Sequence, residues 1–388
     1  MWYIKVLYPM KALIISNGYP DYKGSYRGIF IQRLCLELKR HGVDVVVLTP
    51  KVFRQSPLFE EADGIRVYRF WYPSGNKPLG QSGKAPIFAM GIYMISGILN
   101  ALRLIIKERP DIIHGNWIVP TGLIAGISGL VARLPVVVSA RGMDIRISGR
   151  GLIAVLFDLA VRLSSKITIV SPAMRNRKGL EGAEVISSGV DDRFFDIPSG
   201  HKKLEVIYTR SLEPLYDVET LIRSIPIVFK EIPDVRFIIA GAGSQEEYLK
   251  GLAKDLGVGQ SVEFPGAIPN EYVAGLMKEA KVFVSTATAD GTSVSLLEAM
   301  AAGLIPVVTD IDANRSWITH GKDGYLFEAG NHQDLAENII TALTGRLPVS
   351  LLEQKRAGLK ERISWSSVAK RFISIYNETI KESGWLQR

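Results

Sequence analysis

Apolar residues along the chain fall into short continuous runs separated by longer amphipathic stretches. The run KALIIS (11–16) is followed by an amphipathic stretch and then by VDVVVLTP (43–50). Nearly continuous β-branched runs are typical of parallel strands covered on both faces. The stretch between these two runs carries its apolar residues at helical spacing, at Ile31, Leu34, Cys35 and Leu38. The beginning of the chain therefore predicts a β-α-β unit.

The second half of the chain repeats this plan with different residues. LEVIYTRS (204–211) and VRFIIAGAG (235–243) read as strands, and the segment between them is amphipathic. Its predicted helix carries the apolar residues Val218, Leu221, Ile222, Ile225, Val228 and Phe229. Each half thus predicts a doubly wound, Rossmann-like parallel sheet of the α/β class. Because ligands of such sheets bind beyond the carboxyl ends of the strands, we expect the site in a cleft between two facing domains.

Turn-rich composition places the domain boundary near VISSGVDDRFF (185–195), with DIPSGHKK (196–203) as the linker. We expect an N-terminal domain over residues 1–190 and a C-terminal domain over 191–365. The remaining residues, 366–388, predict a helix with one apolar face.

An uncharged stretch of 18 residues, 85–102, is about as long as the shortest membrane-spanning helix. It contains Pro86, Gly91, Gly97 and Asn100, so it is only moderately apolar. We expect a buried helix here, with a membrane-dipping helix as the alternative. Residues 1–9 lack the apolar run and cleavage site of a signal peptide.

Charge is divided unevenly between the two halves. The net charge of +8 is the balance of +13 in residues 1–190 and −5 in residues 191–388. A basic half favours contact with an anionic partner such as a membrane surface, and a solvated basic face is the alternative. No nucleic-acid-binding motif is present, so we expect no nucleic-acid partner. The single cysteine excludes an intrachain disulfide, and a reducing, cytoplasmic compartment fits it.

The segment DGTSVSLLEAM (290–300) carries the strongest candidate chemistry. A loop precedes a predicted helix, whose first free amides and positive dipole end attract phosphate. Glu298 lies about one turn into that helix, where a carboxylate can accept sugar hydroxyls. The alternative is a capping box in which Glu298 only satisfies the helix end that Ser295 begins.

Two weaker motifs add less to the prediction of function. AGAGSQE (240–246) has two glycines of a dinucleotide fingerprint but Glu246 in place of the third, which disfavours a dehydrogenase. Asp310 and Asp312 form an Asp-x-Asp pair without further metal-ligand spacing, and we expect no metal site.

Two strand ends of the first half carry polar candidates. His114 ends a predicted strand and fits either an acid–base contact or a buried structural histidine. Arg141, Asp144 and Arg146 follow the strand VVVSA, where the arginines can hold phosphate or pair with Asp144.

Several segments together resemble the retaining glycosyltransferases of family 4, which have the GT-B fold. The resemblance covers about residues 11–380. Its most specific segments are VEFPGAIPNEYVAGLMKEAKVFVSTATADGTSVSLLEAMAAGLIPVV (262–308) and HGKDGYLFEAG (320–330), and its supporting segments are GIFIQRLCLELKRHGVDVVVLTP (28–50), RPDIIHGNW (109–117), SSGVDDRFF (187–195) and FIIAGAGSQEEYLKGLAKDLGV (237–258).

The resemblance implies transfer of a sugar from a nucleotide donor, with retention at the anomeric carbon and without an essential metal or other cofactor. It implies that the C-terminal domain binds the donor, that the N-terminal domain binds the acceptor, and that the last helix crosses back onto the N-terminal domain. Asp290 would contact the donor sugar and Glu298 the ribose. The donor-binding positions would be Gly291, Thr292, Ser293 and Val294 at the diphosphate and Gly241, Gly243, Gly266 and Ile268 near the base. A loop with Gly24, Arg27 and Gly28 would close over the diphosphate and the acceptor.

The sequence departs from the family pattern at four positions. Asp290 replaces a glutamate, and Tyr216 stands where the second phosphate-binding cation, a lysine, is usual. Arg210 then remains as the cation for the leaving diphosphate, with Arg141, which replaces a histidine, as a weaker candidate. Ser188 replaces an asparagine.

These features predict a hexosyltransferase that uses a glycan or lipid-linked acceptor in cell-envelope synthesis. We expect it in the cytoplasm or at the inner membrane face. A sugar-nucleotide epimerase of the same fold and a non-catalytic nucleotide-sugar-binding protein are the alternatives.

Overall fold

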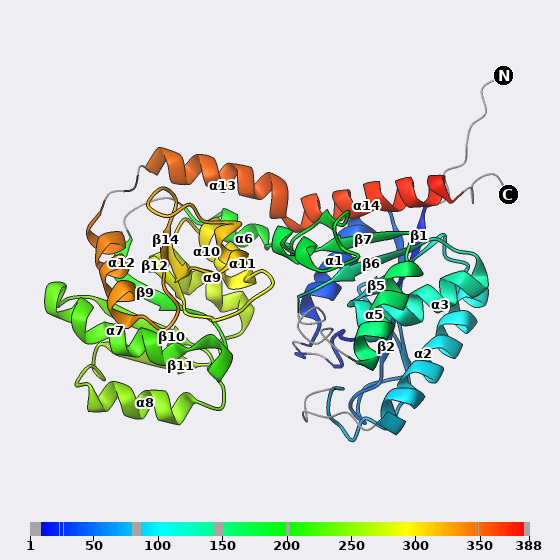
Figure 1. The fold of residues 1–388 in the computed structure, drawn as a ribbon, viewed down its shortest axis with the longest axis horizontal. Coiled ribbons are helices and arrows are strands. Elements are labelled where there is room, and N and C mark those ends of the chain that lie inside the picture. Colours follow the sequence, from blue (N-terminus) through cyan, green and yellow to red (C-terminus); the bar gives the residue numbers. More distant parts are fainter. Residues whose placement is uncertain are drawn as a thin grey trace. The chain divides into compact units, whose positions relative to one another are not determined.

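The computed structural model describes residues 9–22, 24–25, 27–79, 87–142, 151–198, 202–345, 347 and 349–383. It divides into two compact units. The first unit contains Met1–Gly189 and Trp365–Arg388, and the second contains Val190–Ser364. Each unit is an α/β structure built on its own sheet, which is mostly parallel in the first unit and parallel in the second (Figure 1).

The first unit has an eight-stranded sheet in the order β3-β4-β2-β1-β5-β6-β7-β8. All neighbours are parallel except β3 and β4, which are antiparallel. The strands are β1 (Lys11–Ser16), β2 (Asp44–Pro50), β3 (Phe59–Ala62), β4 (Ile65–Phe70), β5 (Ile112–Asn116), β6 (Val136–Ala140), β7 (Lys166–Ile169) and β8 (Glu184–Val185).

Helices cover both faces of this sheet, as continuous apolar strands require. One face packs against α2 (Ile87–Glu108), α3 (Leu123–Ala132) and α5 (Leu152–Arg162), with a π-helical turn, Ile118–Gly122, before α3. The other face packs against α1 (Ile29–Arg40) and the last helix, α14 (Trp365–Glu382). The apolar side of α14, with Val368, Phe372 and Tyr376, is buried in this second layer.

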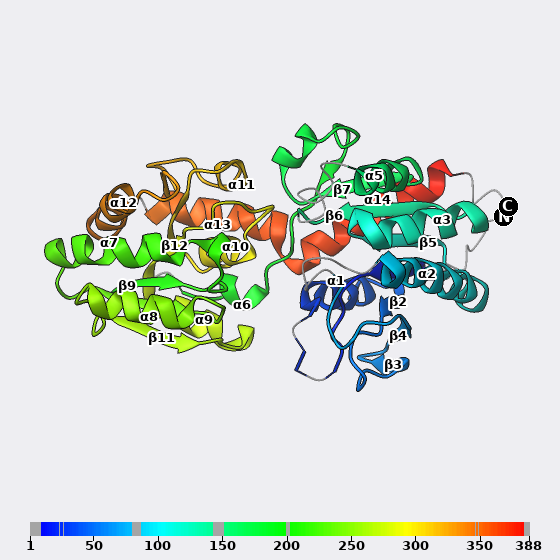
Figure 2. The same ribbon diagram turned by 60° about the horizontal axis from the view of Figure 1, so that its bottom comes forward.

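The second unit has a six-stranded parallel sheet in the order β11-β10-β9-β12-β13-β14. Its strands are β9 (Lys203–Tyr208), β10 (Arg236–Ala240), β11 (Val262–Gly266), β12 (Ala280–Ser285), β13 (Ile305–Thr309) and β14 (Tyr325–Phe327). Its helices are α6 (Asp192–Phe195), α7 (Val218–Glu231), α8 (Glu246–Asp255), α9 (Asn270–Glu279), α10 (Val294–Ala301), α11 (Asp312–Arg315), α12 (His332–Thr344) and α13 (Val349–Ile363). Figure 2 shows helices on both faces of this sheet as well.

Two expectations about the chain's organisation need correction. The beginning of segment 196–203 is not a linker, because Ile197 is buried in the core of the second unit and its carbonyl accepts a hydrogen bond from Arg356. The uncharged stretch after residue 85 is not a fully buried helix. In α2 the inner face enters the core, but Ile95 and Leu99 are more than 60% exposed.

Candidate functional site

A pocket of about 390 Å³ lies in the second unit, beyond the carboxyl ends of β9, β10 and β11. Parallel strands end at the same edge of a sheet, so the loops that follow them converge there. The pocket also reaches α9 through Val273 and the beginning of α10 through Ser295. Its remaining lining residues are Thr209, Arg210, Ser211, Tyr216, Ala240, Gly241, Ala242, Ala267 and Ile268.

Arg210 is the cation of this pocket. Its Nη1 atom lies 2.6 Å from Oδ2 of Asp290, and both side chains are mostly buried. On its other side the guanidinium lies over the ring of Tyr216, 4.5 Å from the ring centroid. Tyr216 therefore does not replace the usual lysine as a second charge. It contributes an aromatic face that attracts and positions the one cation.

The beginning of α10 is capped by Ser293, whose hydroxyl accepts a hydrogen bond from the Leu296 amide at 3.2 Å. Ser295 lies inside the helix and donates to the Thr209 carbonyl. The capping box that would have started at Ser295 is therefore absent. The amides of Val294 and Ser295 open the helix, where they have no intrahelical acceptor, and amides in such a position attract anions.

Asp290 also organises the loop before α10. Its Oδ1 atom accepts a hydrogen bond from the Gly291 amide at 2.8 Å. The Thr292 hydroxyl donates to the Gly291 carbonyl at 2.9 Å. The Gly291 amide is thus engaged by Asp290 rather than free for a phosphate in this structure.

Glu298 lies on α10, one turn beyond Ser295, and is only 8% exposed. Its Oε1 atom accepts a hydrogen bond of 3.2 Å from the side-chain amide of Asn270, the first residue of α9. Burial raises the pKa of Glu298 to about 7, partly offset by the Asn270 hydrogen bond and the nearby charge of Arg193. The carboxyl group is therefore directed at a neighbouring helix and not at its own helix end.

Glycine is required for different structural reasons at the positions expected near the base. A Cβ atom on Gly241 would lie 2.0 Å from the Arg210 carbonyl oxygen, and one on Gly243 would lie 2.3 Å from that of Leu212. Both glycines let the loop after β10 pack against the loop after β9. Gly266 ends β11 with a φ of 75°, a conformation that favours glycine, and Ile268 lines the pocket.

Asp310 and Asp312 are engaged by an arginine. Both carboxylates pair with Arg315, at 2.6 Å and 3.1 Å respectively. Within the part of the chain that the structure describes, no group of three histidine, cysteine or acidic side chains could hold a metal ion.

His114 belongs to the core of the first unit. It is fully buried in β5, and its two ring nitrogens lie 2.6 Å from the Tyr376 hydroxyl and 2.7 Å from the Ser139 hydroxyl. Burial, with a smaller contribution from Arg141, lowers its pKa to about 3. A buried neutral histidine with both nitrogens engaged does not fit an acid–base role, so of the two sequence interpretations the structural one holds. Its hydrogen bond to Tyr376 links α14 to the sheet.

Arg141 follows β6, and its Nη2 atom donates to the Asn116 side chain at 2.6 Å. The guanidinium also lies 5.3 Å from the ring centroid of Phe30. Asp144 and Arg146, the other charged candidates of this segment, lie outside the described residues.

The expected glycine loop of the first unit is held by an ion pair. Arg27 binds Asp21, which is fully buried, with its Nε and Nη2 atoms at 2.6 Å and 2.8 Å. Gly28 precedes α1 with a φ of 70°, and a Cβ atom there would lie 2.2 Å from the Gly18 carbonyl carbon. Gly24 also has a positive φ, 89°, but faces open space.

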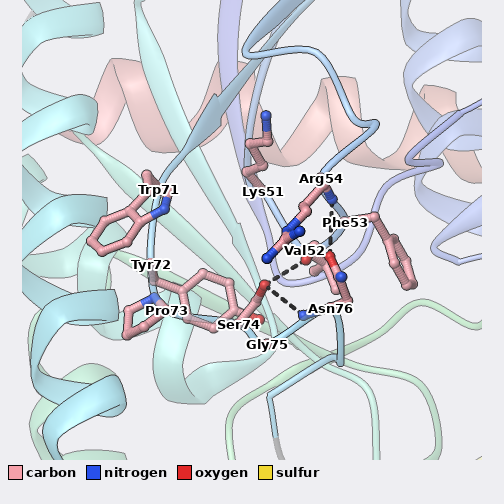
Figure 3. A pocket seen from close by; sticks show the side chains of 10 residues that line it. All are labelled: Lys51, Val52, Phe53, Arg54, Trp71, Tyr72, Pro73, Ser74, Gly75 and Asn76. Atoms are coloured by element: carbon pink, nitrogen blue, oxygen red, sulfur yellow. Dashed lines mark hydrogen bonds between the residues drawn. The ribbon is translucent and has the colours of Figure 1, made fainter.

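A second pocket, of about 270 Å³, was not anticipated from the sequence (Figure 3). It lies beyond the ends of β2 and β4, between the segments 51–54 and 71–76. Ser74 donates to the Val52 carbonyl, and the Arg54 amide donates to Asn76, so the two segments are hydrogen-bonded together. The walls carry Lys51, Arg54 and Trp71, the last 58% exposed. These residues stand in turns without a motif, so only the fold brings them together.

Solved structures identify the class of fold. Sucrose-phosphate synthase from Thermosynechococcus elongatus superposes with a TM-score of 0.74 at 17% identity, covering 96% of this chain and all of the other. Anabaena Alr3699/HepE, solved in complex with UDP, superposes with a TM-score of 0.72 at 18% identity, covering 95% of this chain and all of the other. The chain thus has the two-domain GT-B fold of glycosyltransferases, as the sequence predicted.

Sequence comparison defines the family. The family model for glycosyl transferases group 1 matches residues 190–362, and the model for the glycosyl transferase 4-like domain matches residues 28–183. These two models match adjacent parts that together make up most of the chain. The protein belongs to the group 1, family 4-like glycosyltransferases, which confirms the predicted resemblance.

Individual relatives are distant. An uncharacterized glycosyltransferase of Methanocaldococcus jannaschii, MJ1607, is 24% identical over 97% of this chain and its own full length. One component of the phosphatidylinositol N-acetylglucosaminyltransferase of Arabidopsis thaliana is 25% identical over 96% of this chain and 83% of its own. The phosphatidyl-myo-inositol mannosyltransferase of Mycobacterium leprae is 30% identical, but over only 44% of this chain and 45% of its own.

Proposed function

We propose that this glycosyltransferase is a retaining, metal-independent hexosyltransferase that takes its sugar from a nucleoside-diphosphate donor. The observation that carries the proposal is the position of Arg210 and Asp290 beside the beginning of α10, at the carboxyl ends of the strands. A diphosphate needs a cation and free amides, and both are present there. Structural neighbours solved with UDP or UDP-glucose support a nucleotide-sugar donor.

In the proposed reaction, an acceptor hydroxyl attacks the anomeric carbon on the side from which the phosphate leaves. The bond from that carbon to the phosphate oxygen breaks, and the departing diphosphate takes the electron pair. The hydroxyl proton passes to a phosphate oxygen. Arg210 and the amides of Val294 and Ser295 stabilise the charge on the leaving group. Asp290 binds hydroxyls of the donor sugar, and Glu298 binds the ribose.

For the acceptor we propose a glycan or lipid-linked sugar that carries an anionic group, bound by the first unit in the pocket with Lys51, Arg54 and Trp71. Neither cation has a carboxylate partner among the described residues, and an exposed indole offers an apolar face to a sugar ring. The relatives named for phosphatidylinositol sugar transfer support an acceptor of this kind. Such acceptors belong to cell-envelope synthesis, and the enzyme would work in the cytoplasm or at the inner membrane face.

Thermal unfolding in the presence of a panel of nucleotide sugars tests the donor. A bound donor raises the midpoint by an amount that grows with the logarithm of its concentration divided by its Kd, and we expect one nucleotide sugar to raise it equally well with a chelator present. With donor and acceptor the enzyme should release nucleoside diphosphate, and Glu298→Ala should lower turnover by about 10²-fold. Wild-type turnover in that variant would reject the donor role of Glu298.

The second candidate function, a sugar-nucleotide epimerase of the same fold, predicts conversion of the donor with no acceptor present. The third, a non-catalytic binding protein, predicts donor protection without release of nucleoside diphosphate. Analysis of the donor after incubation without acceptor, together with thermal protection and release of nucleoside diphosphate, therefore separates all three.

A further inference from the structure

Helix α2 is apolar on its outer face as well as on its inner face. Its inner side chains enter the core of the first unit, among them Tyr93, whose hydroxyl donates to Asn17 at 2.9 Å. Its outer side chains are large, apolar and 61–78% exposed, namely Phe88, Ile95, Leu99 and Ile106. Among the described residues, α2 is the helix that is long and apolar enough to cross a membrane.

The exposed side chains of α2 form a straight stripe. They follow one another at intervals of seven, four and seven residues. At about 100° per residue these intervals keep all four side chains within about 40° of one direction, and at 1.5 Å per residue the stripe is about 27 Å long. The four side chains therefore share one side of the helix and are not a scatter of single exposed residues.

Two neighbouring helices extend the apolar surface. Helix α3 packs between α2 and α5, and Figures 1 and 2 show the three helices together on one side of the first unit's sheet. The end of α3 exposes Leu130 and Val131 by more than 60%. Helix α5 exposes Leu152, Val155 and Leu159 at helical spacing. We call these side chains, together with the α2 stripe, the apolar face of the first unit.

Cations border the apolar face, and acids are nearly absent from it. Arg103 on α2, Arg133 after α3 and Arg162 on α5 are exposed and have no carboxylate partner among the described residues. The exposed carboxylate within the described parts of these three helices is Asp158, which lies 3.5 Å from Arg177. An apolar surface with a cationic border matches the boundary between acyl chains and anionic headgroups of a lipid bilayer.

We propose that the apolar face is a membrane-docking surface, on which the first unit binds anionic lipid with α2 lying in the plane of the interface. A spanning position is excluded for α2 in this fold, because Tyr93 and the rest of its inner face are part of the sheet's core. A second copy of the chain is the weaker occupant, since a symmetric contact would bring the same unpaired cations together. The inference rests on this surface alone and stands whether or not the proposed transfer reaction is correct.

Co-sedimentation with vesicles tests the proposal. The wild-type chain should bind vesicles of phosphatidylcholine with about 30% phosphatidylglycerol, and bind pure phosphatidylcholine much less. Leu99→Gln with Ile106→Gln should lower binding at least about tenfold, because two large apolar side chains no longer enter the lipid. The matched control, Leu204→Gln with Leu351→Gln, changes two exposed leucines of the second unit and should bind like the wild type.

The cationic border has a separate test. Arg103→Gln, Arg133→Gln and Arg162→Gln together should reduce binding to the anionic vesicles and remove most of its dependence on salt, while leaving residual binding through the apolar face. Nucleotide-sugar protection in thermal unfolding should stay unchanged in all these variants, which separates a folding defect or a wrong donor assignment from a failure of the docking surface.

A single probe keeps the proposal falsifiable if a double variant folds poorly. Ile95→Trp places an indole in the middle of the stripe, and its emission should shift to the blue when anionic vesicles are added. The absence of such a shift would overturn the proposal. Equal vesicle binding by Leu99→Gln with Ile106→Gln and by the control, Leu204→Gln with Leu351→Gln, would overturn it too. A wild-type chain that is dimeric in solution and becomes monomeric in Leu99→Gln with Ile106→Gln would also overturn it and assign the face to a second copy.

Discussion

Arg210 and Asp290 bind one another in the candidate donor pocket, with Nη1 and Oδ2 separated by 2.6 Å. The same guanidinium is the cation that the proposed mechanism assigns to the leaving diphosphate. The carboxylate thus occupies the anionic position beside Arg210 in this structure. Binding of a donor would exchange partners: the diphosphate takes Arg210, and Asp290 is released to the hydroxyls of the sugar.

This exchange predicts opposite effects of two substitutions on binding of the nucleoside diphosphate product. Arg210→Gln should weaken binding of the nucleoside diphosphate and lower turnover by about 10²-fold or more, because the leaving diphosphate loses the guanidinium that stabilises its charge. Asp290→Asn should also lower turnover, but it should tighten product binding by about fivefold because a competing anion has been removed. Product inhibition constants measure both effects. Unchanged product affinity in Asp290→Asn would contradict the exchange.

The pocket between segments 51–54 and 71–76 gives a prediction about the acceptor. Lys51→Ala with Arg54→Ala should raise the KM for an anionic acceptor by about tenfold or more and leave the KM for the donor unchanged, since two charged contacts are lost on one substrate only. Lys77→Ala is the matched control, because Lys77 is an exposed cation that does not line this pocket. An equal rise in both KM values would place the pocket outside the acceptor site.

Much of this architecture could be predicted from the pattern of residues. Continuous runs such as KALIIS predict buried parallel strands, and they form them. Burial direction was harder to predict. His114 was expected at a strand end, but β5 continues to Asn116. The sequence also could not show that Tyr376, 262 positions away, covers His114. The exposure of Ile95 and Leu99 was also missed, because an apolar helix gives no polar face to mark the solvent side. The pocket with Lys51 and Trp71 depends on loops that meet only after folding.

The burial of Glu298 predicts a pH-dependent stability in the second unit. Its pKa rises from a usual value of 4.5 to about 7, so the folded state holds a proton that the unfolded state has lost between those values. Stability therefore falls as the pH rises from about 4.5 to 7, by up to about 1.4 kcal/mol per pH unit from this group. Glu298→Gln cannot ionise, and it should be more stable than the wild type at pH 8 and similar at pH 4.

Denaturant unfolding at the two pH values, followed by a probe in the second unit, measures this difference. Glu263→Gln is the control, because Glu263 is an exposed acid of the same unit. The measured quantity is the stability of Glu298→Gln minus that of the wild type. If this difference is no larger at pH 8 than at pH 4, the carboxyl group is not desolvated.

His114 predicts the opposite dependence in the first unit. Burial lowers its pKa from 6.5 to about 3, so the unfolded state binds a proton between those values and the folded state does not. Stability from this group is complete above about pH 6.5 and is lost as the pH falls toward 3. His114→Gln removes the hydrogen bonds of the imidazole to Tyr376 and Ser139, so it should destabilise the first unit at pH 7.5. The loss should be smaller at pH 5. At that pH the wild type is itself less stable, because its unfolded state binds a proton at His114 and its folded state does not.

Hydrogen exchange of the β5 and β6 amides at the two pH values reports the stability of this unit directly. A catalytic histidine would instead give a variant with normal protection and a changed pH profile of turnover, and that outcome would restore the acid–base interpretation.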